Sequence, residues 1–96
     1  MAPPRKLPRL FEMHWGRGEI VEEATFAGEY HEPAIQLLSY TEGEAAGSFS
    51  IRFCSYNHRG QFQRSPLMVG EEEIEGLRKA LQATPQIRDV LRRLID

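Results

Sequence analysis

Residues 49–69 read FSIRFCSYNHRGQFQRSPLMV, and this stretch decides the fold. Apolar and polar residues alternate on both sides of Asn57-His58-Arg59-Gly60, which is the pattern of two half-buried strands. Asn at the first turn position and Gly at the last are typical of a type I turn, and a left-handed Gly60 closes a three-residue hairpin loop. The stretch therefore predicts a β-hairpin.

The loop length sets the register of this hairpin. It places Tyr56 opposite Phe62 and Ile51 opposite Leu67, so that the apolar residues coincide on one face. A register shifted by one residue would set Leu67 against Ser50 and mix the two faces. We expect one face to turn toward the helices and the other to be open. The first carries Phe49, Ile51 and Phe53; the second carries Arg52, Cys54, Tyr56, Phe62 and Arg64.

The segments around the hairpin complete an α+β pattern. Residues 11–15, 19–26 and 33–41 read as strands, the first two joined by a turn at Gly16-Arg17-Gly18, although EIVEEA (19–24) also fits a short helical turn. Downstream, Ile74, Leu77 and Leu81 share one helical face. Thr84-Pro85 supplies an N-cap and a first-turn proline, which breaks the helical region there. Strands first and helices last predict an antiparallel sheet covered on one face.

Length and composition indicate one small domain. The chain has 96 residues, so its core is small and gains from self-association. Its first ten residues, MAPPRKLPRL, are rich in proline and basic side chains and predict a flexible tail, with residues 11–96 as a single α+β domain. A lone Cys54, no signal-peptide pattern and no apolar run of about 20 residues lead us to expect a cytoplasmic protein with no membrane association.

Charge is sorted along the chain. There are 14 acidic residues and 12 Lys+Arg in total, yet no acid lies between Ala45 and Gly70. Arginines interleaved with aromatic rings suit single-stranded nucleic acid, because guanidiniums meet phosphates and each ring stacks on an unpaired base for about 1–3 kcal/mol. We expect phosphate contacts from the arginines, stacking from the two rings and further contacts from the hairpin tip. The candidate residues are Arg52, Tyr56, His58, Arg59, Phe62 and Arg64.

Two other interpretations of this face stay open. Tyr56 and Phe62 also fit an ordinary cross-strand aromatic pair, with the arginines providing solubility. The same face also suits a protein-interaction module that docks an acidic partner, since Tyr and Arg are common interface anchors.

The sequence gives no pattern for catalysis or a metal. The three histidines and Cys54 lack metal-ligand spacing, and no acid or oxyanion donor is placed beside Cys54 to make it a nucleophile. We therefore expect no enzyme activity, no metal and no cofactor.

The hairpin and the helix together resemble a known family. Ile51-Arg52 followed by seven residues and Gly60, then Leu67-Met68-Val69 running directly into Gly70-Glu71-Glu72-Glu73-Ile74, is similar to the transcriptional coactivator family called positive cofactor four. The similar part covers about residues 33–95. The chain departs from the family in a shortened second half of the hairpin and in the break at Thr84-Pro85.

The resemblance implies a fold and a function. The expected fold is a curved antiparallel sheet of about four strands followed by a C-terminal helical region, with residues 1–32 free to add a hairpin. The expected partner is single-stranded DNA, or RNA, bound with little sequence preference in transcription or DNA maintenance. The resemblance also implies a homodimer formed through the helical region. The apolar stripe of the second helix exceeds what one small sheet covers, although packing within one chain is the alternative. This stripe consists of Ile87, Val90, Leu91 and Leu94.

Overall fold

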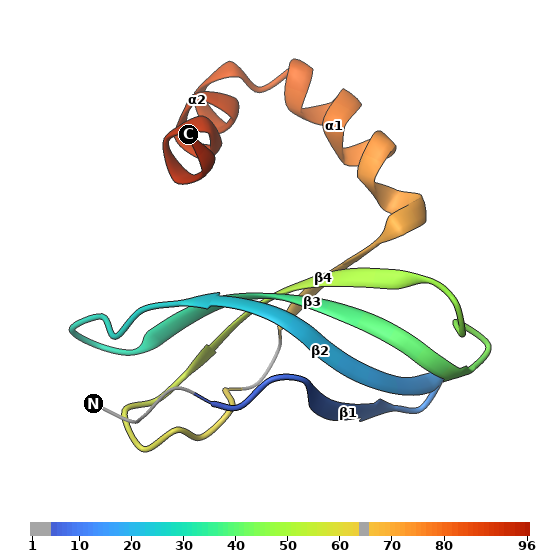
Figure 1. The fold of residues 1–96 in the computed structure, drawn as a ribbon. Coiled ribbons are helices and arrows are strands. Elements are labelled where there is room, and N and C mark those ends of the chain that lie inside the picture. The colour runs from blue at the N-terminus through green and yellow to red at the C-terminus, as the bar shows by residue number, and fades with distance from the viewer. Residues whose placement is uncertain (1–4, 64–65) are drawn as a thin grey trace.

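The computed structural model describes residues 5–63 and 66–96 as an open antiparallel sheet followed by helices (Figure 1). Each strand pairs with the next one along the chain, in the order β1-β2-β3-β4-β5. This confirms the α+β prediction, and the expected N-terminal hairpin is β1–β2. The strands are β1 (Arg9–Met13), β2 (Gly16–Thr25), β3 (Glu32–Gly43), β4 (Phe49–Tyr56) and β5 (Leu67–Gly70). A 3-10 turn (Glu71–Glu73), α1 (Ile74–Gln82) and α2 (Pro85–Ile95) follow.

The first two strands differ in detail from the prediction. The chain turns at His14 and Trp15, so Gly16 already belongs to β2. The segment EIVEEA lies within β2, which rejects the helical alternative. Of the predicted tail, residues 1–4 lie outside the described residues, and β1 begins at Arg9.

The predicted hairpin tip is present in β4–β5. The amide of Gly60 donates to the carbonyl of Asn57 at 2.9 Å, and the amide of Asn57 donates to the carbonyl of Gln61 at 2.9 Å. Gly60 has φ 83°, the left-handed conformation that the loop requires. Tyr56 and Phe62 form a β-bridge, as the loop length predicted.

Beyond the tip, the predicted pairing is wrong by two residues. Ile51 lies opposite Val69 rather than Leu67, and Phe53 lies opposite Leu67. Pro66 has no amide hydrogen and cannot continue the ladder, so the pairing resumes only at Leu67. Because side chains alternate with a period of two, this shift leaves Ile51, Phe53, Leu67 and Val69 on their predicted face.

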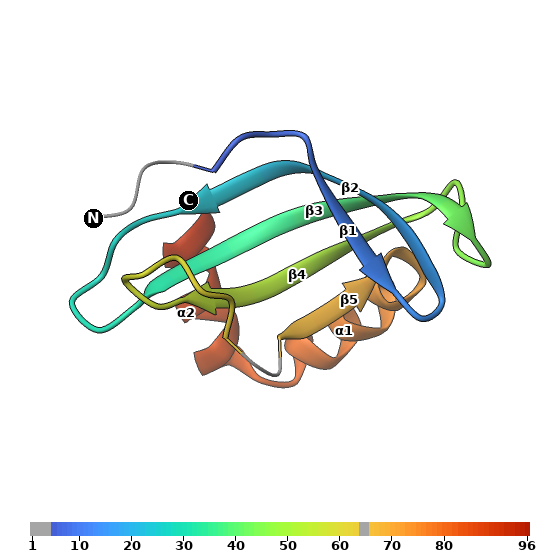
Figure 2. The ribbon, with the colours of Figure 1, turned by 90° about the horizontal axis from the view of Figure 1, so that it is seen from below.

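The two faces of the sheet are buried in the opposite order to the one we expected. The inner face is defined by the β3 residues Glu32, Ala34, Gln36, Leu38 and Tyr40 and by the β4 residues Ser50, Arg52, Cys54 and Tyr56. Most of the buried side chains belong to it. Two register irregularities in β2 sharpen the bend of the sheet. As a result β1 runs across the inner face (Figure 2) and covers it.

The helices lie over the other face of the sheet without closing on it (Figure 1). The break at Thr84-Pro85 is confirmed, with Pro85 as the first residue of α2. Within residues 71–96, all of them described, no side chain is buried, and Val90 and Leu94 are each about 60% exposed. Ile35, Phe53 and Leu94 line a groove of about 660 Å³ between sheet and helix. Neither helix has the length and apolar character needed to cross a bilayer.

Candidate nucleic-acid interface

Arg52 lies in the middle of the inner face and is fixed by Gln36, its partner across β3 and β4. The guanidinium Nε of Arg52 donates to Gln36 Oε1 at 2.7 Å. The amide nitrogen of Gln36 donates to Glu23 Oε2 at 2.6 Å and to the hydroxyl of Tyr56 at 2.9 Å. Arg52 is only 7% exposed and Gln36 only 1% exposed. Buried polar groups are costly unless they are hydrogen-bonded, and these are.

Glu23 of β2 is the acidic centre of this network. Its Oε2 also forms ion pairs with Arg9 Nη2 at 3.2 Å and with Arg5 Nη2 at 3.5 Å, and its side chain is only 4% exposed. Burial favours the neutral acid, but the hydrogen bonds from Gln36 and Arg9 outweigh it and lower the pKa of Glu23. Burial likewise opposes the charge on Arg9, but the hydrogen bonds to Glu23 and Tyr56 raise its pKa.

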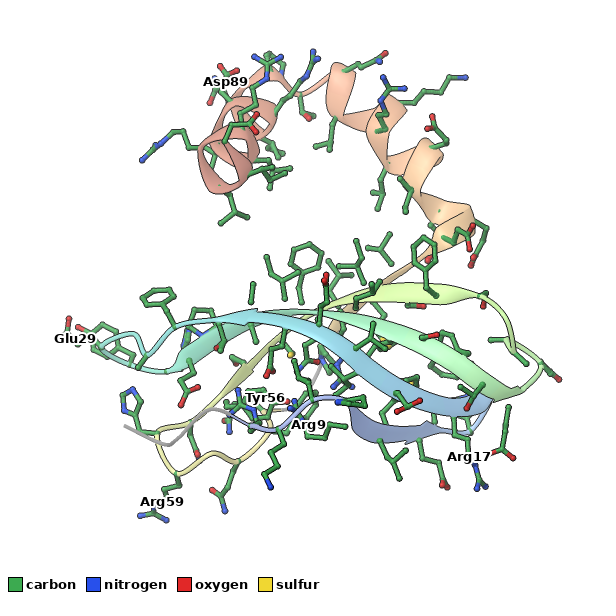
Figure 3. The ribbon with its side chains drawn as sticks, viewed as in Figure 1. Arg9, Arg17, Glu29, Tyr56, Arg59 and Asp89 are labelled. Carbon is green, nitrogen blue, oxygen red and sulfur yellow. The ribbon has the colours of Figure 1, made fainter. Side chains whose placement is uncertain are left out.

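Tyr56 is covered, although we expected its ring to be open for stacking. Its hydroxyl accepts hydrogen bonds from Gln36 and, at 3.3 Å, from Arg9 Nη2. The guanidinium carbon of Arg5 lies 3.6 Å from the centroid of its ring. The residue is 6% exposed, and Figure 3 shows Tyr56 and Arg9 close together beneath the sheet. The N-terminal segment thus occupies one face of a ring that we assigned to bases.

Phe62 is the aromatic residue that stays accessible. It is 42% exposed, and its ring meets Tyr56 edge to face, with centroids 5.5 Å apart and planes at 74°. The guanidinium carbon of Arg52 lies 4.7 Å from the Phe62 centroid. The structure therefore brings Arg52, Tyr56 and Phe62 together into one cluster, which we call the stacking platform.

The remaining candidate residues lie at the hairpin tip. Arg59 is exposed and points away from the sheet (Figure 3). His58 is exposed too, and its Nε2 lies 2.8 Å from the carbonyl oxygen of Gly28 in the β2–β3 loop. Because a carbonyl only accepts, this Nε2 carries a proton and donates it. Arg64 lies outside the described residues.

Sequence reasoning missed the residues that hold the platform in place. Glu23, Arg5 and Arg9 belong to segments whose contacts depend on how β1 crosses the sheet. A signal did exist for Gln36, the one amide side chain within the apolar strand PAIQLLSY (33–40). A polar residue in such a strand indicates a buried hydrogen-bond network.

Cys54 is partly buried, and the metal-binding residue types are scattered over the described part of the chain. Burial raises the pKa of the Cys54 thiol, so that less of it is the nucleophilic thiolate. Across residues 5–63 and 66–96, no three His, Cys, Asp or Glu side chains gather closely enough to hold a metal ion.

Comparisons of the chain with protein-family models, with curated proteins and with solved structures found no match. Membership of the positive cofactor four family therefore stays a prediction from the residues alone.

Proposed function

We propose that this protein binds single-stranded nucleic acid, DNA or RNA, through the stacking platform and the hairpin tip, and that it is not an enzyme. The observation that carries the proposal is the set of contacts that hold the Phe62 ring in place. Phe62 is 42% exposed, and its ring is held by contacts with Tyr56 and Arg52. A ring fixed in this way stacks on a base for about 1–3 kcal/mol and loses little side-chain entropy when it binds.

The structure supports different roles for the residues than the sequence suggested. Arg52 is buried and bonded to Gln36, so its role is to position Phe62 rather than to meet a phosphate. Arg59 is exposed and is the candidate for phosphate contact, whereas His58, although exposed, already uses its Nε2 proton on the carbonyl of Gly28. Stacking and phosphate contacts read no base edges, which favours binding with little sequence preference. A role in transcription or DNA maintenance, in line with the family resemblance, and a cytoplasmic location, as the composition predicts, are part of the same proposal.

Fluorescence anisotropy with labelled single-stranded DNA, duplex DNA and RNA tests this function. We expect micromolar or tighter binding to single strands that weakens between about 50 and 200 mM salt. Phe62→Ala should weaken binding about 5- to 150-fold, in line with one lost stack of about 1–3 kcal/mol. Trp15→Ala is the matched control, because Trp15 is also a partly exposed aromatic residue but lies in the β1–β2 turn, outside both the stacking platform and the groove.

The salt dependence separates the roles of the tip and the platform. Arg59→Ala should weaken binding to all sequences alike and reduce the salt slope by about one unit, as expected for one phosphate contact. Absence of binding to every oligonucleotide at low salt would refute the proposed function. Equal losses from Phe62→Ala and Trp15→Ala would refute the platform.

We also propose that the protein is a homodimer whose second copy covers the groove between the sheet and the helices. The apolar stripe of α2 supports this, since Ile87, Val90 and Leu94 are each more than half exposed. Leu67 and Phe53 are exposed on the facing side of the sheet as well. A monomer rarely leaves two facing apolar surfaces uncovered, whereas a self-complementary patch closes as a symmetric dimer.

A further inference from the structure

The side chain of Arg5 occupies a cage built by three strands of the sheet. The ring of Tyr56 lies 3.6 Å from its guanidinium carbon, and its Nη2 lies 3.5 Å from Oε2 of both Glu23 and Glu32. Glu23 belongs to β2, Glu32 to β3 and Tyr56 to β4, and Glu32 lies directly opposite Tyr56 in the register. The sheet thus builds the cage without any residue of the segment that fills it. We call Glu23, Glu32 and Tyr56 the guanidinium cage.

The two acids of the cage are deeply buried, which is unusual for carboxylates. The side chain of Glu23 is 4% exposed and that of Glu32 is 8% exposed. Carboxylates are rarely buried unless cations compensate them. Arg9 reaches Glu23, so Glu32 depends on Arg5 for its cationic partner among the described residues.

Arg5 fills the cage incompletely. Both of its ion pairs use the same nitrogen, Nη2, at 3.5 Å, which is long for a charge-assisted hydrogen bond. Among the described residues, Arg5 Nε and Glu32 Oε1 are buried and have no hydrogen-bond partner. A guanidinium in the usual two-bond arrangement with Glu32 would satisfy this oxygen. The cage therefore has binding capacity that Arg5 does not use.

We propose that the guanidinium cage is an arginine-binding site, which takes an arginine side chain of a protein partner when Arg5 leaves it. Two carboxylates and the face of a tyrosine ring match the charge and the flat shape of a guanidinium. The same carboxylates repel phosphate, so the cage takes a different ligand from the nucleic-acid platform, although the two share Tyr56. The group held in the structure is the side chain of an arginine within a polypeptide, which favours a peptide over free arginine.

Arg5 competes with such a partner because it is tethered next to the cage. A short tether gives an effective concentration in the millimolar range. This lowers the apparent affinity for an external arginine of submillimolar affinity by about tenfold. The full chain should therefore bind an arginine peptide weakly, and removal of Arg5 should expose the site.

Calorimetric titration of the full-length chain with acetyl-Ala-Arg-Ala-amide tests the proposal. We expect Arg5→Ala to bind this peptide saturably and about tenfold more tightly than the wild type. The corresponding lysine peptide should bind more weakly, because an ammonium cannot make the two-bond contact. Free arginine serves as the arm that separates a peptide site from an amino-acid site, and we expect it to bind more weakly than the peptide.

Two further variants, both in the Arg5→Ala background, test the residues of the cage. Glu32→Gln should abolish the gain in affinity, whereas Glu29→Gln, an exposed acid in the preceding loop, should leave it intact. Equal affinity of Arg5→Ala and wild type, equal binding of the lysine peptide, or unchanged binding after Glu32→Gln would each overturn the proposal. Tighter binding of free arginine than of the peptide would overturn the proposal that the ligand belongs to a protein partner.

A thermal readout keeps the test decisive if Arg5→Ala is too unstable to titrate. Methylguanidinium should then raise the melting temperature of the variant, because it refills the cage, and methylammonium should do so less. No difference between the two cations would overturn the proposal. None of these outcomes depends on whether the hairpin binds nucleic acid.

Discussion

Gln36 connects three strands through one amide group. Its amide oxygen accepts a hydrogen bond from Arg52, and its amide nitrogen donates to Glu23 and Tyr56. Both ends of the amide are therefore hydrogen-bonded, although the side chain is almost fully buried. A side chain of the same size without polar atoms would fill the same space, but its present partners would stay buried without their hydrogen bonds. The inner face is therefore held by polar bonds as well as by apolar contact.

Replacing Gln36 should reveal this dependence. Gln36→Leu leaves the Nε of Arg52 buried without its acceptor, and we expect unfolding in urea to lose about 1–3 kcal/mol. Adding Arg52→Met should recover part of the loss, because removing both partners is cheaper than removing one. A double variant less stable than the single one would contradict this explanation.

The charge of Glu23 makes stability depend on pH. Its pKa in the folded protein is lowered below the ordinary value of 4.5. The contribution of this charge to the free energy of unfolding is therefore complete above the ordinary pKa and is lost as the pH falls through the lower folded pKa. The free energy of unfolding of the wild type should exceed that of Glu23→Gln by about 1–3 kcal/mol at neutral pH. This difference should shrink below the ordinary pKa.

Urea unfolding at about pH 7, 5 and 3 measures that difference. Glu29→Gln is the control, because Glu29 is exposed in the β2–β3 loop (Figure 3) and should change stability little at any of these pH values. A difference between wild type and Glu23→Gln that is as large at about pH 3 as at neutral pH would contradict the role of the Glu23 charge.

At the scale of elements, the crossing of β1 over the sheet depends on a close approach at Gly18. Gly18 lies opposite Phe11 in β1 and Tyr40 in β3, and these two rings meet edge to face with centroids 5.2 Å apart. A Cβ at Gly18 would lie 1.9 Å from the backbone oxygen of Ser39. Because backbone atoms of a central strand cannot move aside cheaply, a side chain here forces the strands apart.

Gly18→Ala should therefore destabilise the protein by about 1–3 kcal/mol, the usual cost of forcing atoms into a packed region. Gly76→Ala is the matched control in α1, where a Cβ would meet nothing within 4 Å. Alanine favours a helix over glycine, so this control should stabilise α1 by about 0.5–1 kcal/mol. Thermal unfolding followed by circular dichroism compares the two, and equal shifts of the same sign would contradict the close approach.

The local elements could be predicted from the sequence, but their burial could not. Asn57 and Gly60 determine the hairpin tip within four residues, and Thr84-Pro85 determines the helix break in the same local way. The shift of pairing at Leu67 arises where Pro66 interrupts the ladder. The alternation of apolar and polar side chains does not predict how many residues such an interruption takes. The fold class and the division of the described β4 and β5 residues between two faces were therefore confirmed, while the register beyond the tip was not.

The candidate site was harder to predict because its charges come from distant segments. The acid-free stretch from Ala45 to Gly70 suggested an open positive face. In the folded chain, Gln36 fixes Arg52, and Glu23 and Glu32 bring acids to the same face from β2 and β3. Charge sorted along a sequence is thus not charge sorted on a surface, because an antiparallel sheet sets each strand beside its neighbours.

At the scale of the whole molecule, the groove between the sheet and the helices leaves apolar side chains of both exposed. The inner face is closed by β1 and residues 5–8, whereas the helices lie over the other face and none of their own residues is buried. A second copy that supplies its own α2 to this groove would bury both apolar surfaces at once. The stripe of α2 is then the contact whose loss should separate the copies.

Leu94→Asp should convert the protein from a dimer to a monomer. Leu94 lines the groove and is 60% exposed in the single chain, so a charge there should cost little when the chain is alone and much when a partner covers it. Burying one leucine is worth about 1.5–3 kcal/mol, and a symmetric interface loses it twice, so we expect dimerisation to weaken at least about 100-fold. Arg92→Asp, which puts the same charge on the opposite side of α2, should leave the mass unchanged. Light scattering at tens of micromolar measures both variants, and a monomeric mass for the wild type, or a dimeric mass for Leu94→Asp, would refute a dimer formed through this groove.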